Sequence, residues 1–157
     1  MTVDVLERTE RSASEEQVYV TLTVAGQLCG IPVLGVRDIL AEQPITRVPL
    51  APADIAGSLN LRGRIVTAID LRCRLKLPPP PEGQKRMSVV AEQGGELYAL
   101  LVDQVSEVMT LDHTLLERNP PTLDRVWTLF SDGIYRLDGR LLVILDVARL
   151  LDYAIQS

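Results

Sequence analysis

Few residues in this sequence have the types and spacing that catalysis needs. A single histidine, His113, lies in a polar stretch that is typical of a surface turn or a helix start. Asp38 and Glu107 could act as a carboxylate pair in an enzyme, but no nucleophile–base set, metal-ligand cluster or phosphate-binding loop accompanies them. Gly94 and Gly95 form an isolated pair, which favours a hairpin turn. The sequence therefore predicts no catalytic residue, no cofactor and no metal site.

The densest polar signal surrounds Arg62 and Gly63, between Leu61 and a predicted strand. This spacing predicts a turn, because glycine permits a positive φ, and it projects the arginine outward. Two interpretations stay open for the side chain. It is either a solvated hairpin arginine, which the sequence alone favours, or a planar donor fork fixed beside an acid, with Asp38 as the candidate partner.

The composition favours a cytoplasmic globular protein. With 46% hydrophobic and 24% charged residues, the 157-residue chain is too apolar for a disordered one. Its net charge of −5 repels nucleic acid and anionic lipid, so we expect neither nucleic acid nor direct membrane contact. The longest apolar runs, Leu97–Val102 and Leu141–Leu145, are far shorter than a membrane span, and residues 1–17 lack the apolar core of a secretory signal.

The two cysteines, Cys29 and Cys73, have neither metal-ligand nor CxxC spacing. We expect two buried thiols in a reducing cytosol. A disulfide between them stays the alternative.

The hydrophobic pattern predicts mostly strands and turns. Apolar residues alternate with others from Val18 to Ala25, and the Gly26-Gln27 turn leads into Leu28–Val33, which completes a hairpin. The same unit recurs as Val89–Ala91 and Leu97–Val102. Short strands separated by turns favour small barrels over a parallel sheet.

Two further strands are predicted to be covered on both faces. Arg64–Ile69 and Arg140–Leu145 are almost continuously apolar. Asp70 and Asp146 follow them, where each would cap the first turn of a short helix. After the second cap, apolar residues at helical spacing predict a helix over Val147–Ala154.

The two halves of the chain repeat each other. Gly26–Ile39 matches Gly95–Val108 in pattern, and Gly63–Leu75 matches Gly139–Leu151. Two matched blocks in the same order favour a duplicated subdomain over chance. Between them lies Pro78–Gly83, which is typical of a stiff, exposed connector because consecutive prolines neither pair in a sheet nor continue a helix.

These observations predict a flexible N-terminal tail at residues 1–16 and one domain at residues 17–157. We expect the domain to consist of two subdomains at about residues 17–80 and 85–157. The exchange of segments between the two subdomains stays open at this point.

Two motifs in the first half resemble the signature of the CheW family of chemotaxis coupling proteins. They are Asn60-Leu61-Arg62-Gly63 and Ile69-Asp70-Leu71-Arg72. Four other segments share the resemblance: Val36–Ile39, Ile45–Pro49, Val102–Val105 and Gly139–Leu151. The resemblance runs from about Val18 to Asp152, with the motifs in the expected order.

The resemblance implies an all-β fold of two similar, intertwined, SH3-like five-stranded β-barrel subdomains. A hydrophobic seam would join them, and short helices would include one at the C-terminus. It also implies an adaptor, not an enzyme. Such a protein would join the cytoplasmic tip of methyl-accepting chemoreceptors to the regulatory domain of the histidine kinase CheA. We expect it to be monomeric when free and cytoplasmic, and to be recruited to membrane-associated receptor arrays.

Carried over residue by residue, the resemblance implies a receptor-binding groove. The groove residues would be Val36, Asp38, Ile39, Arg62, Val105 and Val108. Without the resemblance, the four apolar members would be expected in the core. Asp38 stands where glutamate is more usual in the family, which shortens its reach to a basic partner. Gly57 and Gly133 match turn glycines of the family, and the kinase-facing residues stay unassigned.

Two other functions remain alternatives. The chain could be a CheW-like regulatory module of a kinase or of a CheV-type protein, although no kinase or receiver segment occurs in the sequence. It could also be an enzyme that uses Asp38 and Glu107, although no other feature of the sequence supports an enzyme.

Overall fold

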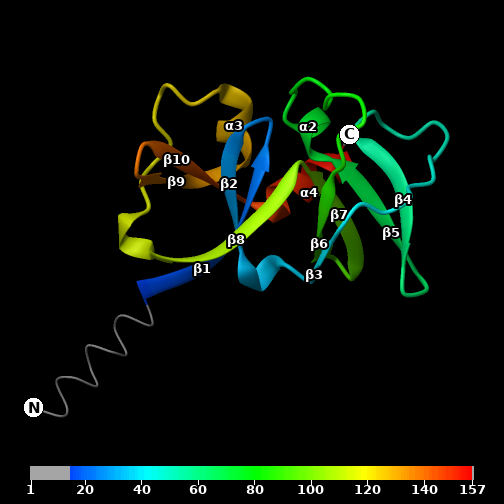
Figure 1. Cartoon of the computed structure of the whole chain (residues 1–157), viewed down its shortest axis with the longest axis horizontal. Coiled ribbons are helices and arrows are strands. Elements are labelled where there is room, and N and C mark those ends of the chain that lie inside the picture. The colour runs from blue at the N-terminus through cyan, green and yellow to red at the C-terminus, as the bar shows by residue number, and fades with distance from the viewer. Residues whose placement is uncertain (1–14, 157) are drawn as a thin grey trace, which may run out of the picture.

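Within residues 15–156, the part of the chain that the computed structural model describes, ten strands form two five-stranded sheets (Figure 1). Side chains are described as far as residue 152. Residues 1–14 of the tail predicted at residues 1–16 lie outside the described residues. The first strand begins at Glu16, the last residue of the predicted tail. The all-β fold with two five-stranded units and short helices is confirmed.

The elements follow one another closely along the chain. The strands are β1 (Glu16–Val24), β2 (Gln27–Pro32), β3 (Asp38–Leu40), β4 (Ile55–Leu61), β5 (Arg64–Asp70), β6 (Met87–Gln93), β7 (Glu96–Val102), β8 (Gln104–Asp112), β9 (Ser131–Leu137) and β10 (Arg140–Leu145). The helices are α2 (Leu71–Arg74), α3 (Arg125–Phe130) and α4 (Val147–Gln156), with 3₁₀ turns η1 (Val33–Gly35) and η2 (His113–Leu115).

Each sheet combines strands from both halves of the chain. The first sheet has the order β8-β1-β2-β10-β9, and the second has the order β3-β6-β7-β5-β4. The hairpin β1–β2 therefore pairs with strands of the second half, and the hairpin β6–β7 pairs with strands of the first. The strands before and after the Pro78–Gly83 connector thus exchange their hairpins between the two sheets. The chain crosses between the sheets at η1 and again between β7 and β8.

The internal repeat extends to the register of the sheets. In the first sheet β2 runs parallel to β10, with Gly30 opposite Ile144. In the second sheet β7 runs parallel to β5, with Ala99 opposite Ala68. The sequence repeat aligns Gly30 with Ala99 and Ile144 with Ala68, so the two junctions are equivalent positions. The hairpin exchange is therefore reciprocal.

Three apolar clusters stabilise this arrangement. The largest is the seam between the sheets, which contains Leu22 and Ile31 from the first sheet, Ile69 and Leu100 from the second, and Leu150 of α4. Two smaller clusters fill the individual barrels, one around Leu59 and Val66, the other around Tyr19 and Tyr135. The hydrophobic seam that the family resemblance implied is thus present.

Both predicted helix caps are confirmed. The Asp70 carboxylate accepts a hydrogen bond from the Cys73 amide at 3.2 Å, and Asp146 accepts one from the Arg149 amide at 3.2 Å. Both cysteines are free thiols, but only Cys29 is fully buried; the expectation of two buried thiols is wrong for Cys73, which is partly exposed. Burial raises the pKa of the Cys29 thiol, so this thiol stays protonated and unreactive.

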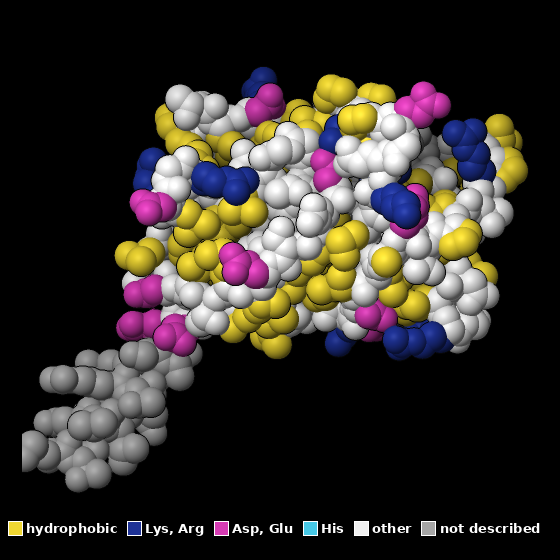
Figure 2. Space-filling view, in the orientation of Figure 1, with side chains coloured by type: hydrophobic (Ala, Val, Ile, Leu, Met, Phe, Trp, Pro, Cys, Tyr) yellow, Lys and Arg dark blue, Asp and Glu magenta, His cyan; other side chains and the backbone are white. Residues whose placement is uncertain are grey.

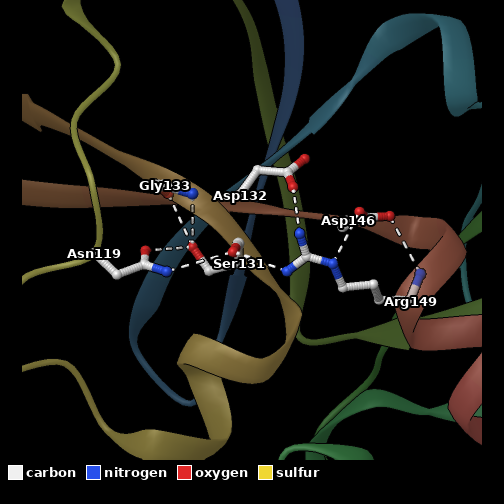
Figure 3. A network of polar contacts seen from close by, with 6 residues as sticks. All are labelled: Asn119, Ser131, Asp132, Gly133, Asp146 and Arg149. Atoms are coloured by element: carbon white, nitrogen blue, oxygen red, sulfur yellow. Dashed lines mark hydrogen bonds and ion pairs between the residues drawn. The ribbon is translucent and has the colours of Figure 1, made fainter.

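Polar contacts anchor the start of α4 to β9 (Figure 3). The Arg149 guanidinium contacts the Asp146 carboxylate at 3.2 Å and the Asp132 carboxylate at 3.1 Å, and it donates to the Ser131 carbonyl. The Ser131 hydroxyl donates to the Asn119 side chain at 2.7 Å. The helix is therefore attached to the first sheet at its first turn, while its apolar face packs in the seam.

The prediction that Gly57 and Gly133 are turn glycines is wrong. They lie inside β4 and β9, at φ values of 149° and 148°. A β-carbon on Gly57 would collide with the Thr46 carbonyl, and one on Gly133 would collide with the Glu117 carbonyl. At these points a neighbouring segment pairs closely with the strand, so glycine is needed for close approach of two backbones.

Candidate functional site

Four of the six predicted groove residues lie on edge strands of different sheets, while Val36 precedes β3 and Arg62 lies in the turn between β4 and β5. β3, with Asp38 and Ile39, is an edge strand of the second sheet, and β8, with Val105 and Val108, is an edge strand of the first. In Figure 1, β8 crosses the front of the molecule and β3 lies to its lower right. Figure 2 shows apolar side chains gathered on this face, over β8 and around the segment that leads to β3.

The four apolar groove candidates divide into two kinds. Ile39 and Val108 are exposed, at 38% and 58% of their surface. Val36 and Val105 are half-buried and pack against the seam. Another protein could contact Val108 over more than half of its surface and Ile39 over more than a third, while the second pair also supports the core. The expectation of core positions therefore holds in part for Val36 and Val105, and the receptor-binding groove stays a prediction.

Arg62 lies in the hairpin turn between β4 and β5. Its φ is 50° and that of Gly63 is 85°, as in a type I′ turn. The Gly63 amide donates to the Asn60 side-chain oxygen at 2.8 Å, which fixes the turn. This backbone conformation is rare for arginine, and it directs the side chain away from the hairpin.

The predicted partner of Arg62 is confirmed. Its Nη2 atom lies 3.3 Å from Oδ2 of Asp38, and the Arg62 side chain is 83% exposed. The other carboxylate oxygen of Asp38 accepts a hydrogen bond from the Ile39 amide at 2.8 Å. Arg62 therefore combines both interpretations, because it is solvated and yet contacts an acid. An exposed pair of this kind adds little stability, and most of its donors remain available.

A pocket of about 320 Å³ opens beside this ion pair. Its charged lining includes Arg37, Arg64 and Glu92 as well as Arg62 and Asp38. Arg37 contacts Glu92 through Nε at 3.3 Å, and both side chains are exposed. The second sheet thus presents a mixed-charge corner with one more basic than acidic group, directly beside β3.

Sequence reasoning missed several members of this surface. Arg37 and Arg64 are direct neighbours of residues in the motifs, and Glu92 comes from β6, which only the sheet order brings to β3. Leu34, in the crossing segment η1, is 86% exposed. Both the exposure of Leu34 and the position of Glu92 beside β3 required the tertiary structure.

The repeat does not reproduce the charged pair at the other barrel. The positions equivalent to Asp38 and Arg62 are Glu107 and Asp138, two acids. Glu107 lies exposed on β8. Within the described residues no group of three or more acidic, histidine or cysteine side chains could hold a metal ion. None of the described helices is long and apolar enough to cross a membrane.

Comparison with known proteins assigns the chain to a family. A family model described as CheW-like domain matches residues 18–154. The probable chemotaxis protein CheW of Rhizobium etli is 28% identical over 135 residues, which cover 86% of this chain and 87% of that protein. Chemotaxis protein CheW of Bacillus subtilis is 31% identical over 134 residues, 85% of each chain.

A solved structure agrees with these matches. The crystal structure of scaffolding protein TtCheW from Thermoanaerobacter tengcongensis is similar with a TM-score of 0.73 at 30% identity, over 83% of this chain and 88% of that one. Sequence and structure therefore agree over nearly all of the described residues, and the protein belongs to the CheW-like domain family.

Proposed function

We propose that this protein is a chemotaxis adaptor that couples methyl-accepting chemoreceptors to the histidine kinase CheA in signalling arrays. The observation that carries the proposal is the pair of edge strands β3 and β8, which present exposed Ile39 and Val108 near a charged corner with Arg62. Membership of the CheW-like domain family, with relatives named chemotaxis protein CheW, supports it.

Receptor binding is proposed to use the six groove residues. The receptor tip is expected to be a helical hairpin, and an amphipathic helix binds a groove through apolar residues at helical spacing. Ile39 and Val108 would contact the helix, with Val36 and Val105 beneath them. Arg62 and Asp38 would set the register of the helix and reject wrong partners more than they would add affinity.

Kinase binding is proposed for the regulatory domain of CheA, through residues that stay unassigned. We expect each contact to have a micromolar dissociation constant, about −8 kcal/mol, and the many contacts in an array to supply the overall tightness. We propose that the protein is monomeric when free, that it neither makes nor breaks a covalent bond, and that it binds no cofactor. It is proposed to reside in the cytoplasm until it is recruited to receptor arrays.

The test compares two exposed apolar residues. Val108 on β8 is 58% exposed and Leu129 on α3 is 59% exposed, so aspartate at either position should leave the fold intact. We expect Val108→Asp to weaken binding to a receptor-tip fragment by at least about tenfold, or 1.4 kcal/mol, because it places a charge in an apolar contact. Leu129→Asp should leave that affinity unchanged. Far-UV circular dichroism of both variants should match that of the wild type.

A reconstitution tests the whole function. Wild-type protein added to receptor-containing membranes and CheA should change the rate of kinase autophosphorylation, and Val108→Asp should not. Unchanged phosphorylation with the wild-type protein would show that it is not the adaptor.

A further inference from the structure

A buried ion pair occupies the point where the chain returns from the second sheet to the first. Arg72 of α2 donates from Nε to Oδ1 of Asp103 at 2.8 Å and from Nη2 to Oδ2 at 2.6 Å. Their side chains are only 10% and 13% exposed. This two-pronged contact fixes the orientation as well as the distance of its partners. Arg72 also donates from Nη1 to the Pro78 carbonyl of the connector at 2.9 Å.

Asp103 connects this helix to the opposite sheet. It stands between β7 of the second sheet and β8 of the first. Its amide donates to the Thr23 carbonyl of β1 at 3.0 Å, and its Oδ2 atom accepts from the Ala25 amide at the tip of the β1–β2 hairpin at 2.8 Å. One residue therefore links α2, which belongs to the second sheet, with the hairpin against which β8 pairs.

The internal repeat does not account for this pair. The positions equivalent to Asp103 and Arg72 are Leu34 and Ala148, neither of which can form an ion pair. At the other crossing the turn η1 contains no buried residue, and Leu34 projects into solvent. The two crossings are thus equivalent in topology, but of the two only the one that leads into β8 has a buried ion pair between side chains.

We propose that the Arg72–Asp103 pair positions β8 relative to β3, and so sets the spacing between the two sides of the receptor-binding groove. The proposed sides of the groove lie on different sheets, which are otherwise joined by the apolar seam, by a hydrogen bond from the Val105 amide to the Met87 sulfur at 3.3 Å and by an exposed Gln93–Asp152 contact. Apolar burial is non-directional, so it holds the sheets together without favouring one of several closely related relative positions. The buried ion pair favours one relative position, because its two hydrogen bonds are directional. This inference rests on the proposed receptor binding, and both residues are positioning residues that do not touch the receptor.

The decisive variant replaces both partners at once. Arg72→Met with Asp103→Leu removes the directional contact without leaving a buried charge, and such apolar replacements are often neutral for stability. The matched control lies on the same helix. Arg74 contacts Asp54 at 2.9 Å, with side-chain exposures of 0% and 14%, and Asp54 directly precedes β4 of the second sheet. Arg74→Met with Asp54→Leu is therefore the control.

The first readout is geometric and does not depend on any partner. Spin labels on cysteines introduced at the exposed residues Glu42 and Ser106, in a Cys73→Ser background, report the distance between the end of β3 and β8. We expect one narrow distance distribution in the otherwise unchanged protein and in the control pair. The Arg72→Met, Asp103→Leu protein should give a shifted or broadened distribution.

The second readout separates the two proposed partners, with the unlabelled proteins. The Arg72→Met, Asp103→Leu protein should bind a receptor-tip fragment at least about tenfold more weakly. Its affinity for the CheA regulatory domain should change less than about twofold. The affinities of the control variant for both partners should also change less than about twofold. Unchanged label distances, or an equal loss of both affinities, would overturn the positioning role. If the wild type binds no receptor tip, the proposed function fails, and the label distances still decide the inference.

A second variant covers a failure to fold. Arg72→Lys keeps the charge but loses the two-pronged contact, and it should shift the label distances in the same direction by a smaller amount. If neither variant folds, the pair is a requirement for folding and the positioning role is wrong.

Discussion

At the scale of single residues, exposed and buried arginines contribute differently. Arg62 is solvated and contacts Asp38 at 3.3 Å, whereas Arg72 is buried and contacts Asp103 through two hydrogen bonds. An exposed pair is worth little stability, but removing one partner of a buried pair leaves an uncompensated charge. The first residue is therefore free to serve binding, and the second is coupled to the geometry of the fold.

Arg62→Ala should separate binding from stability. We expect the free energy of unfolding to change by less than about 1 kcal/mol, because the lost ion pair is exposed. Receptor coupling should weaken, since the donors that face solvent are lost. Urea unfolding and titration with a receptor-tip fragment measure the two effects. Arg136→Ala is the control, because Arg136 forms a similar exposed pair with Glu117 at 3.0 Å on the other barrel. Equal loss of binding in both variants would contradict a specific role for Arg62.

The stability of the protein should depend on pH through Asp103. Burial alone would raise the pKa of this carboxyl, but hydrogen bonds from Arg72 and the Ala25 amide outweigh burial and hold the pKa below its ordinary value. The folded state therefore binds the proton less readily than the unfolded state. The resulting stabilisation is complete above the ordinary aspartate pKa of about 3.9 and is lost as the pH falls through the folded pKa.

The measurement compares wild type with Asp103→Asn by urea unfolding between about pH 7 and pH 3. We expect the wild type to be more stable at neutral pH and the difference to shrink below about pH 4. A difference that stays constant over this range would show that the charge of Asp103 does not contribute.

At the scale of elements, the two parallel strand junctions differ in the sizes of the side chains that lie opposite each other. The first sheet places Gly30 opposite Ile144, and the second places Ala99 opposite Ala68. A β-carbon on Gly30 would lie 3.0 Å from Cδ1 of Ile144. A large side chain on one strand thus requires the absence of one on the other, because the barrel interiors are closely packed.

A double-mutant cycle tests this coupling. Gly30→Ala alone should destabilise the protein by about 1 kcal/mol through crowding. Ile144→Val removes the Cδ1 atom and alone should cost about 1 kcal/mol. In the double variant the second change relieves the crowding, so the combined cost should be smaller than the sum. Strictly additive free energies of unfolding would show that the two side chains do not compete for space.

At the scale of the whole molecule, the exchange of hairpins joins the two halves of the chain. Each sheet contains strands from both sides of the Pro78–Gly83 connector. Burial of the seam and strand pairing in both sheets therefore hold the halves together without the connector. Since each half alone would leave edge strands unpaired, neither half is expected to form a stable sheet by itself.

Cleavage of the connector tests this architecture. A protease site introduced between Pro79 and Glu82 should be cut readily, because Pro79, Pro81 and Glu82 are exposed. The cut protein should elute as one particle of unchanged size and separate into two fragments only in denaturant. Separation under native conditions would contradict the exchange. Uncut protein with the same insertion is the control for size.

Local features could be predicted because their causes lie within a few residues. The hairpin at Gly26-Gln27 follows from strand alternation and turn residues. The caps at Asp70 and Asp146 follow from a carboxylate that meets free amides of the next turn. The repeat and the motif around Arg62 were equally visible, and the contact with Asp38 could be named as a candidate. Assignment of Gly57 and Gly133 to turns failed because their neighbours, the Thr46 and Glu117 carbonyls, come from other segments.

By itself, the sequence determined the kinds of strands, the turns, the caps and the duplicated pattern, since hydrophobic periodicity and turn residues act over short distances. Only the tertiary structure decided which half each hairpin joins, which groove valines stay exposed, and that Asp103 meets Arg72 where the chain crosses between sheets. These features depend on pairing between residues far apart in the chain, and apolar attraction, which has no direction, does not encode that pairing in any local pattern.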